Sequence, residues 1–267
     1  MIREAAPTHL TIQSAPPATM AQLQRVHSNA YLESIRHGSL DRVAALKLGL
    51  PASEALLTRS RWETGGTIAA MWAARAEGLA CNLAGGTHHA FPDRGLGYCV
   101  VNDVAVAIRD LHAHDPAARI IVIDTDAHQG NGTHAIFADD ERVFTYSIHV
   151  GRNYPAVKVP GSCDVALDRY APGALWLERL QATLPAALVT ARADLACWIA
   201  GADPHRADRF GQLRLTDHDF ARRDELILAL ARQHQLPLAV LYGGGYNRDR
   251  IHTARLHADT VLRVAAG

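Results

Sequence analysis

The chain has 267 residues, which is near the upper end of the range for one domain and short for two α/β domains. Hydrophobic residues make up 48% of it and charged residues 20%, an ordinary globular composition that excludes disorder as a state of the whole chain. Because 27 Lys and Arg balance 27 Asp and Glu, the chain lacks the basic excess typical of proteins that bind nucleic acid. Its 15 histidines point to metal binding or proton transfer.

Residues 1–20 contain prolines and no apolar core of signal-peptide length, and they predict a loose arm or an edge element. No stretch reaches the roughly 18 apolar residues that a membrane span needs. We expect a single domain over residues 1–267, located in the cytoplasm. The cysteines form no CxxC pair, and we expect reduced, mostly buried thiols at Cys81, Cys99, Cys163 and Cys197.

Beyond this arm, helix-length segments alternate with short apolar runs. In chain order, the patterns predict a helix over 20–35, a helix over 67–77, a strand over 79–84, a helix over 103–112, strands over 120–123 and 143–148, a helix over 175–188, a strand over 195–200, a helix over 217–234, a strand over 238–242 and a helix over 250–264. Thr216 is the expected N-cap of the helix at 217. This alternation predicts a parallel sheet with helices on both faces.

Polar and glycine-rich segments follow all five predicted strands. They read GGTHHA at 85–90, DTDAHQGNG at 124–132, SIH at 147–149, GADPH at 201–205 and GGGYN at 243–247. In an open parallel sheet, ligands bind at the carboxyl ends of the strands. Five such ends with site-like residues therefore predict a functional site at this edge of the sheet.

The segment after the second strand has the spacing of a metal site. Asp124, Asp126 and His128 alternate, so in extended geometry their side chains point to one side. Asp203, at another strand end, adds a further carboxylate. Two carboxylates and one imidazole leave a fourth position open, as in a catalytic zinc site. The alternative is that these are capping, loop and ordinary polar residues.

The neighbouring segments offer proton-transfer groups. His88 and His89 follow two glycines and are a candidate general base and acid beside a metal, and Tyr246 sits in a glycine loop. We interpret Cys99 as a residue that lines the wall of the site rather than as a nucleophile. The P-loop pattern, a GxGxxG after the first strand and a GxSxG elbow are all missing from the sequence.

In order along the chain, these motifs resemble those of the zinc-dependent histone deacetylase family and its bacterial relatives, such as acetoin-utilisation proteins and acetylpolyamine amidohydrolases. The motifs that match are RVHSNAYL at 25–32, GTHHA at 86–90, DTDAHQGNG at 124–132, GADP at 201–204 with GQLRLT at 211–216, and GGGY at 243–246. The resemblance implies a three-layer arginase/deacetylase-type α/β fold, with a central, mostly parallel β-sheet flanked by helices. It also implies a zinc-dependent hydrolase that removes an acyl group from acyl-lysine or a related acylated amine.

The resemblance further implies a role for each matching residue. Asp126, His128 and Asp203 would bind one zinc ion, and His88 and His89 would form the proton-transfer dyad with Asp124 behind His88. Tyr246 would polarise the scissile carbonyl. Gly97, Tyr98, Tyr154 and Gly244 would contact the substrate. A monovalent cation, K⁺ or Na⁺, would lie beside Asp124, Ser147 and Ile148, although ordinary strand structure also accounts for the last two.

The chain departs from the family pattern in two places. Asn131 stands where many members have an acid behind the second histidine of the dyad, a feature similar to the class IV branch. The stretch 49–63, which we expect to be a loop, holds only Glu54 and Glu63 as candidates for contacting the substrate backbone, and surface exposure also accounts for both.

Two rival functions remain at the level of sequence. An arginase-like ureohydrolase needs a second acid in a DAHxD pattern, and this chain has Gly130 there. A zinc-binding protein that recognises acyl-lysine without turnover has the same ligands. The substrate is expected to be an acyl-lysine protein or a small acylated amine, with no direct nucleic-acid or membrane partner.

Overall fold

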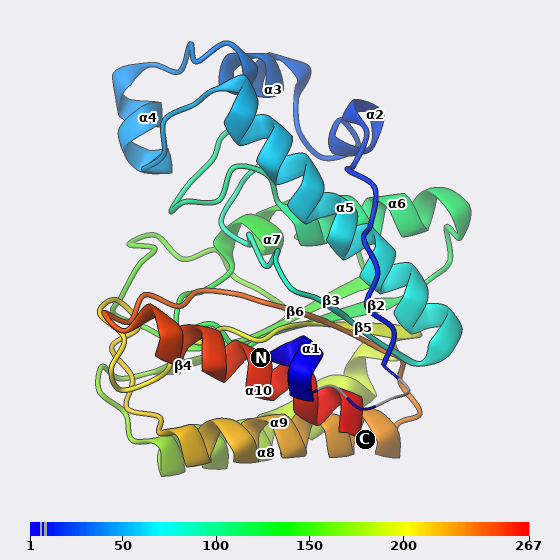
Figure 1. Cartoon of the computed structure of the whole chain (residues 1–267), viewed down its shortest axis with the longest axis vertical. Helices are drawn as coiled ribbons and strands as arrows, with labels where there is room; N and C mark the ends of the chain where they lie inside the picture. Colours follow the sequence, from blue (N-terminus) through cyan, green and yellow to red (C-terminus); the bar gives the residue numbers. More distant parts are fainter. Residues whose placement is uncertain (6, 8–9, 267) are drawn as a thin grey trace.

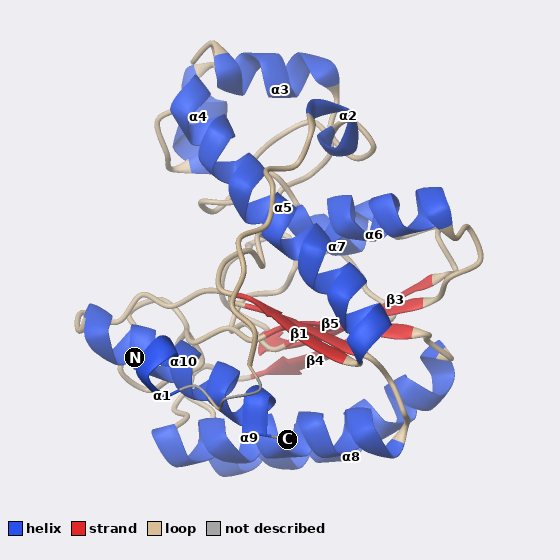
Figure 2. Cartoon of the chain, turned by 45° about the vertical axis from the view of Figure 1, so that its right-hand side comes forward, coloured by secondary structure: helices blue, strands red, loops and turns tan. Residues whose placement is uncertain are grey.

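A computed structural model of the chain describes residues 1–5, 7 and 10–266. Its centre is a six-stranded sheet in the order β1-β6-β5-β2-β3-β4, in which every neighbouring pair of strands is parallel (Figure 2). The strands are β1 (Leu79–Asn82), β2 (Ile120–Asp124), β3 (Val143–Val150), β4 (Cys163–Leu167), β5 (Leu195–Ile199) and β6 (Leu238–Leu241).

Helices cover both faces of the sheet (Figure 1). On one side lie α5 (Glu54–Glu77), α6 (Asp103–His114) and the short α7 (Asn131–Ile136). On the other side lie α8 (Gly173–Ala191), α9 (Asp217–Gln233) and α10 (Arg250–Ala266). The remaining helices are α1 (Ile2–Ala5), α2 (Met20–Leu23), α3 (Asn29–Arg36) and α4 (Arg42–Leu48).

The alternation of side chains along β2 explains why this sheet needs two helical layers. Ile121 and Ile123 pack into the cluster that contains α8 and α9, whereas Ile120 and Val122 pack into the cluster that contains α5 and α6. All five residues of this strand are buried. A strand that is apolar on both faces is stable only between two layers, so the expected three-layer α/β fold is confirmed.

Some boundaries differ from those that the sequence predicts. The helix expected over 20–35 is two helices, because Ser28 caps a new helix while the buried ring of His27 accepts a hydrogen bond from the backbone of Asn102 at 2.9 Å. The expected helix 67–77 is the second half of α5, so most of the stretch 49–63 is helical rather than a loop. The elements α4, α7 and β4 are too short or too polar to show an apolar period.

The first 20 residues contain the one-turn helix α1 and a segment that reaches α5. The backbone N–H of Ala18 donates to the carbonyl of Arg61 at 2.8 Å, and the Arg61 guanidinium donates back to the carbonyl of Ala18 at 2.8 Å. The end of this arm is therefore fixed on α5. Among the described residues, no helix has both the length and the apolar character that crossing a membrane requires.

Candidate active site

The loops at the carboxyl ends of β2 and β5 bring three ligand-type side chains together. His128 Nδ1 lies 3.1 Å from Asp126 Oδ1 and 2.8 Å from Asp203 Oδ2, and all three residues are buried. They come from two segments 75 residues or more apart in sequence, which adjacent parallel strands place at one edge of the sheet.

The surroundings of these three residues fit a bound cation. His128 Nε2 faces the carbonyl oxygen of Phe210 at 3.3 Å, so a ring that binds a cation through Nδ1 would hold its proton on Nε2 and turn the Nδ1 lone pair toward the two carboxylates. Such a lone pair facing carboxylates is repulsive unless a positive charge lies between them. Within the described part of the chain, no donor makes a hydrogen bond with the buried Asp203 Oδ2.

The ionisation of these groups also indicates that the site attracts a positive charge. Burial lowers the pKa of His128, but Asp203 and Asp126 outweigh burial and raise it to about 11. Burial, followed by the charge of Asp126, raises the pKa of Asp203 to about 7. The site thus takes up positive charge, and two carboxylates with one imidazole are a donor set that suits zinc.

Gly244 brings the backbone of the glycine loop against the same carboxylates. Its N–H donates to Asp126 Oδ2 at 2.7 Å. A Cβ at this position would collide with Asp203 Oδ2 and lie 2.7 Å from Asp126 Oδ2. Gly244, expected from the resemblance to contact substrate, therefore has a positioning contact with the candidate ligands.

The two adjacent histidines form a hydrogen-bonded pair beside this trio. His88 Nδ1 lies 2.6 Å from Asp124 Oδ2, the Nε2 atoms of His88 and His89 are 3.2 Å apart, and His89 Nδ1 lies 2.9 Å from Asn131 Oδ1. Each imidazole thus has a different partner behind it: a carboxylate for His88 and a neutral amide for His89.

These partners separate the ionisation of the two rings. Burial lowers the pKa of His88, but Asp124 and Asp126 outweigh it and raise this pKa to about 9. Burial, followed by the charge of His88, lowers the pKa of His89 well below its ordinary value. His89 is the neutral ring of the pair at neutral pH, and a neutral imidazole is the form that accepts a proton.

Asp124 is engaged on both oxygens, because Oδ1 accepts a hydrogen bond from the Asp126 N–H at 3.0 Å. Ser147 is its register partner on β3, and the Ser147 hydroxyl lies 2.9 Å from His149 Nδ1. The Ile148 side chain packs into the core between the sheet and α8. Only its backbone is therefore open to the expected monovalent cation.

Aromatic side chains surround the approach to the two histidines. The Tyr154 ring centroid lies 4.9 Å from that of His89, and a Cβ on Gly97 would lie 2.8 Å from the Tyr154 ring. The Tyr98 ring lies 6.0 Å from the ring of Tyr246. Tyr98 is 48% exposed and Tyr154 37% exposed, so this wall extends from the buried site to the surface.

Tyr246 is held through its backbone. Its N–H donates to Asp208 Oδ2, and its carbonyl accepts from the Arg209 Nε–H at 3.1 Å. The ring lies 5.2 Å from that of Phe210. Burial, followed by the charge of Asp126, raises the pKa of Tyr246, so the phenol keeps its proton at neutral pH.

Sequence reasoning missed two carboxylates that position these loops. Asp103 accepts hydrogen bonds from the N–H groups of Gly86 at 3.0 Å and Thr87 at 2.7 Å, directly before the two histidines. Asp208 holds Tyr246 and also accepts from the Gly211 N–H at 2.9 Å. Asp103 reads as an ordinary helix-start acid, and no sequence pattern distinguishes Asp208 from a loop residue.

The structure also places four other residues that the sequence analysis singled out. Glu54 is the exposed first residue of α5, and Glu63, within the same helix, pairs with Arg59 at 2.8 Å. Burial raises the pKa of Cys99, which keeps this thiol protonated and unsuited to be a nucleophile. A Cβ at Gly130 would lie 2.5 Å from Asp124 Oδ2, which leaves no room for the second acid of a ureohydrolase.

Comparisons with known proteins identify the family and the fold of this chain. Residues 1–262 match the histone deacetylase domain. The chain is 39% identical over 229 residues to an uncharacterized protein of Picosynechococcus sp., with 86% of this chain and 76% of that protein covered. It is 30% identical to histone deacetylase 2 of Arabidopsis thaliana, with 91% of this chain and 65% of that protein covered.

It is also 30% identical to the acetoin utilization protein AcuC of Staphylococcus aureus, with 88% of this chain and 66% of that protein covered. The chain thus spans slightly less than two thirds of the length of these last two relatives. A crystal structure of an HDAC homologue complexed with SAHA has the same fold, with a TM-score of 0.81 and 24% identity over 99% of this chain and 76% of that one. Because the domain match covers nearly the whole sequence, the chain belongs to the histone deacetylase family.

Proposed function

We propose that this chain is a zinc-dependent amide hydrolase that removes an acyl group from acyl-lysine or a related acylated amine. The observation on which this rests is the convergence of Asp126, His128 and Asp203 in a buried site, beside a histidine pair in which one ring is neutral. The names of the relatives, histone deacetylase and acetoin utilization protein, support the deacetylase class of chemistry.

Asp126, His128 and Asp203 would hold the zinc ion. Bound there, the ion would supply Lewis acidity, which polarises a carbonyl and lowers the pKa of water toward about 7. The two carboxylates compensate its charge, and Gly244 keeps the Asp126 carboxylate in place by its hydrogen bond.

The chain's own residues would then move the protons. His89 accepts a proton from the attacking water and later returns it to the leaving amine. His88, charged and fixed by Asp124, keeps the neighbouring ring from being protonated before the reaction begins. The Tyr246 hydroxyl donates to the oxygen on which negative charge develops.

Asn131 modifies this scheme. It faces His89 Nδ1 with a neutral oxygen at 2.9 Å, where a carboxylate would raise the basicity of the ring further. We propose that His89 is consequently a weaker base than a ring backed by an acid. Gly97, Tyr98 and Tyr154 line the path of the acyl-lysine side chain in this proposal.

The remaining parts of the proposal concern the whole chain. We propose that it forms one catalytic domain, and that K⁺ or Na⁺ lies between Asp124 and the backbone of Ser147 and Ile148, on the adjacent strand. The cytoplasm is the proposed location, since all four cysteines are free thiols.

An acetyl-lysine reporter peptide and a panel of longer acyl groups test this function. The zinc-loaded protein should release the acyl group, lose this activity after treatment with a chelator, and regain it when Zn²⁺ is added back. A protein that binds the reporter but never releases the acyl group would instead be a recognition protein. Activity that persists without any metal would contradict the zinc-dependent scheme.

A further inference from the structure

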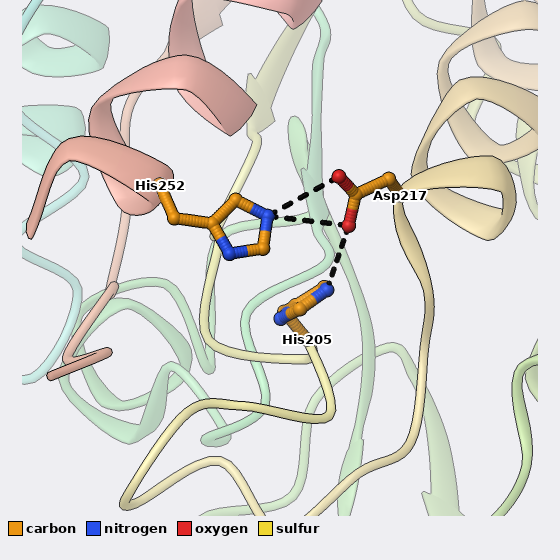
Figure 3. Close-up of side chains that lie close together, drawn as sticks. All are labelled: His205, Asp217 and His252. Atoms are coloured by element: carbon orange, nitrogen blue, oxygen red, sulfur yellow. Dashed lines mark hydrogen bonds and ion pairs between the residues drawn. The ribbon is translucent and has the colours of Figure 1, made fainter. Parts of the chain in front are cut away.

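A second group of metal-ligating side chains lies outside the candidate active site. His205 follows strand β5, Asp217 is the first residue of α9, and His252 lies in the first turn of α10 (Figure 3). One ligand atom from each lies within 4.8 Å of those of the other two. The hydrolase scheme uses none of these three residues.

The three side chains converge on one point. His205 Nε2 lies 2.9 Å from Asp217 Oδ1, and His252 Nε2 lies 3.2 Å from both oxygens of Asp217. Figure 3 shows the two rings approaching the carboxylate from different directions, and their planes are at 78° to each other. Around a tetrahedral zinc ion with bonds of about 2.0–2.1 Å, donor atoms lie about 3.3 Å apart. An ion can therefore enter with small displacements.

The surroundings of these three side chains leave their ligand atoms free to bind a metal ion. His205 is buried, and its neutral imidazole is the form that binds metals. The His205 side chain is only 4% exposed, whereas that of Asp217 is 71% exposed. The carboxylate side is therefore open to ions and to water that would complete the coordination.

Two contacts oppose metal binding. The Asn247 Nδ2 group lies 3.3 Å from His252 Nδ1, and a hydrogen bond there favours the His252 ring proton on Nε2. The Ala207 N–H donates to His205 Nδ1 at 3.2 Å, which places the ring proton on Nε2, where Asp217 accepts it. A metal at Nε2 displaces that proton, and the ring then protonates at Nδ1 and loses the Ala207 hydrogen bond. Both hydrogen bonds are long and therefore weak, and two imidazoles with a carboxylate are a donor set that zinc prefers.

We propose that His205, Asp217 and His252 form a second divalent metal site that takes zinc and is separate from Asp126, His128 and Asp203. The ion would join the loop after β5 to the starts of α9 and α10. Because α10 begins four residues after Tyr246, it would also fix the far end of the glycine loop. The inference stands independently of the proposed hydrolase activity.

Metal titration of the full-length protein tests this site. The protein is stripped with a chelator and titrated with Zn²⁺, and separately with Co²⁺, whose visible absorption reports the coordination. The wild type should bind two equivalents. His252→Ala and Asp217→Asn should bind one, and His218→Ala, which alters an exposed histidine next to Asp217, should still bind two.

His128→Ala distinguishes this proposal from the active-site zinc. If it also lowers the stoichiometry from two to one, both sites exist. If the wild type binds one ion and His252→Ala binds none, the second site stands and the active-site zinc is contradicted. The second site is overturned if His252→Ala and Asp217→Asn, both folded by circular dichroism, bind as many ions as the wild type.

Discussion

Tyr246 combines a buried phenol with a backbone held at both its N–H and its carbonyl by the loop 208–209. Since the side chain is not needed to place its own loop, Tyr246→Phe should keep fold and zinc and lose turnover. Removing one donor to a developing oxyanion lowers the rate by about 10²–10³-fold. The measurement is kcat with the acetyl-lysine reporter.

The zinc content of the Phe variant must be measured alongside, because a loosened glycine loop that shed metal would imitate a catalytic defect. Tyr170→Phe, at an exposed tyrosine outside the site, is the matched control. A wild-type rate for Tyr246→Phe would show that the ring only packs.

Gly244 gives a second prediction at this scale. Gly244→Ala adds a Cβ that collides with Asp203 Oδ2, so the carboxylates must separate. We expect at least a tenfold loss in zinc affinity, about 1.4 kcal/mol or more. The measurement is competition with a zinc indicator. Gly151→Ala is the control, since its Cβ would meet Ala166 at 3.3 Å; equal affinities in the two variants would contradict the positioning role.

At the scale of elements, the N-terminus of α6 holds the loop that bears the two histidines. Asp103 is fully buried and accepts from Gly86, from the Thr87 N–H, and from the Thr87 hydroxyl at 2.6 Å. Asp103→Asn turns an NH₂ group toward at least one of these donors. It should lower the free energy of unfolding by about 1–3 kcal/mol and lower kcat more than it raises KM.

Asp115→Asn at the other end of α6 is the control for this variant, because Asp115 is partly exposed, pairs with Arg75 and accepts a hydrogen bond from the Ala117 N–H. Urea unfolding and steady-state kinetics provide the two readouts. If Asp103→Asn loses stability without any change in kcat, Asp103 supports the fold and not the position of the histidines.

The elements also show which parts of a structure can be predicted from sequence. The strands β2, β5 and β6 were predicted to within one residue at either end, because each is a short, fully buried apolar run. The edge strand β4 was not predicted. Its first four residues alternate between half-buried and exposed, so they form no apolar run, and the strand is stabilised by pairing with β3. The break after α2 depends on His27, whose long-range contacts leave no local signal.

At the scale of the whole molecule, the parallel sheet determines where the chemistry lies. The spacing of Asp126 and His128 is a local signal, and the parallel arrangement predicts that Asp203 joins them, since β2 and β5 end side by side. The His205, Asp217 and His252 group was not predictable in the same way. His252 comes from a helix, and only the packing of α10 on α9 brings it to Asp217.

The active site brings two carboxylates together in the interior of the protein. Because a bound zinc ion compensates their charges, we expect zinc binding to raise the free energy of unfolding of the whole fold. Zinc that binds only the folded state at 100 times its Kd adds about 2.7 kcal/mol, which for a chain of this size raises Tm by about 5–10 °C. His252→Ala removes the second site and isolates the active-site contribution. Scanning calorimetry of this variant should show the rise with Zn²⁺ and its reversal by chelator. The double variant His128→Ala, His252→Ala should show neither the rise in Tm with Zn²⁺ nor its reversal by chelator. If the His252→Ala protein melts at the same temperature with and without zinc, the proposed link between zinc binding and stability is contradicted.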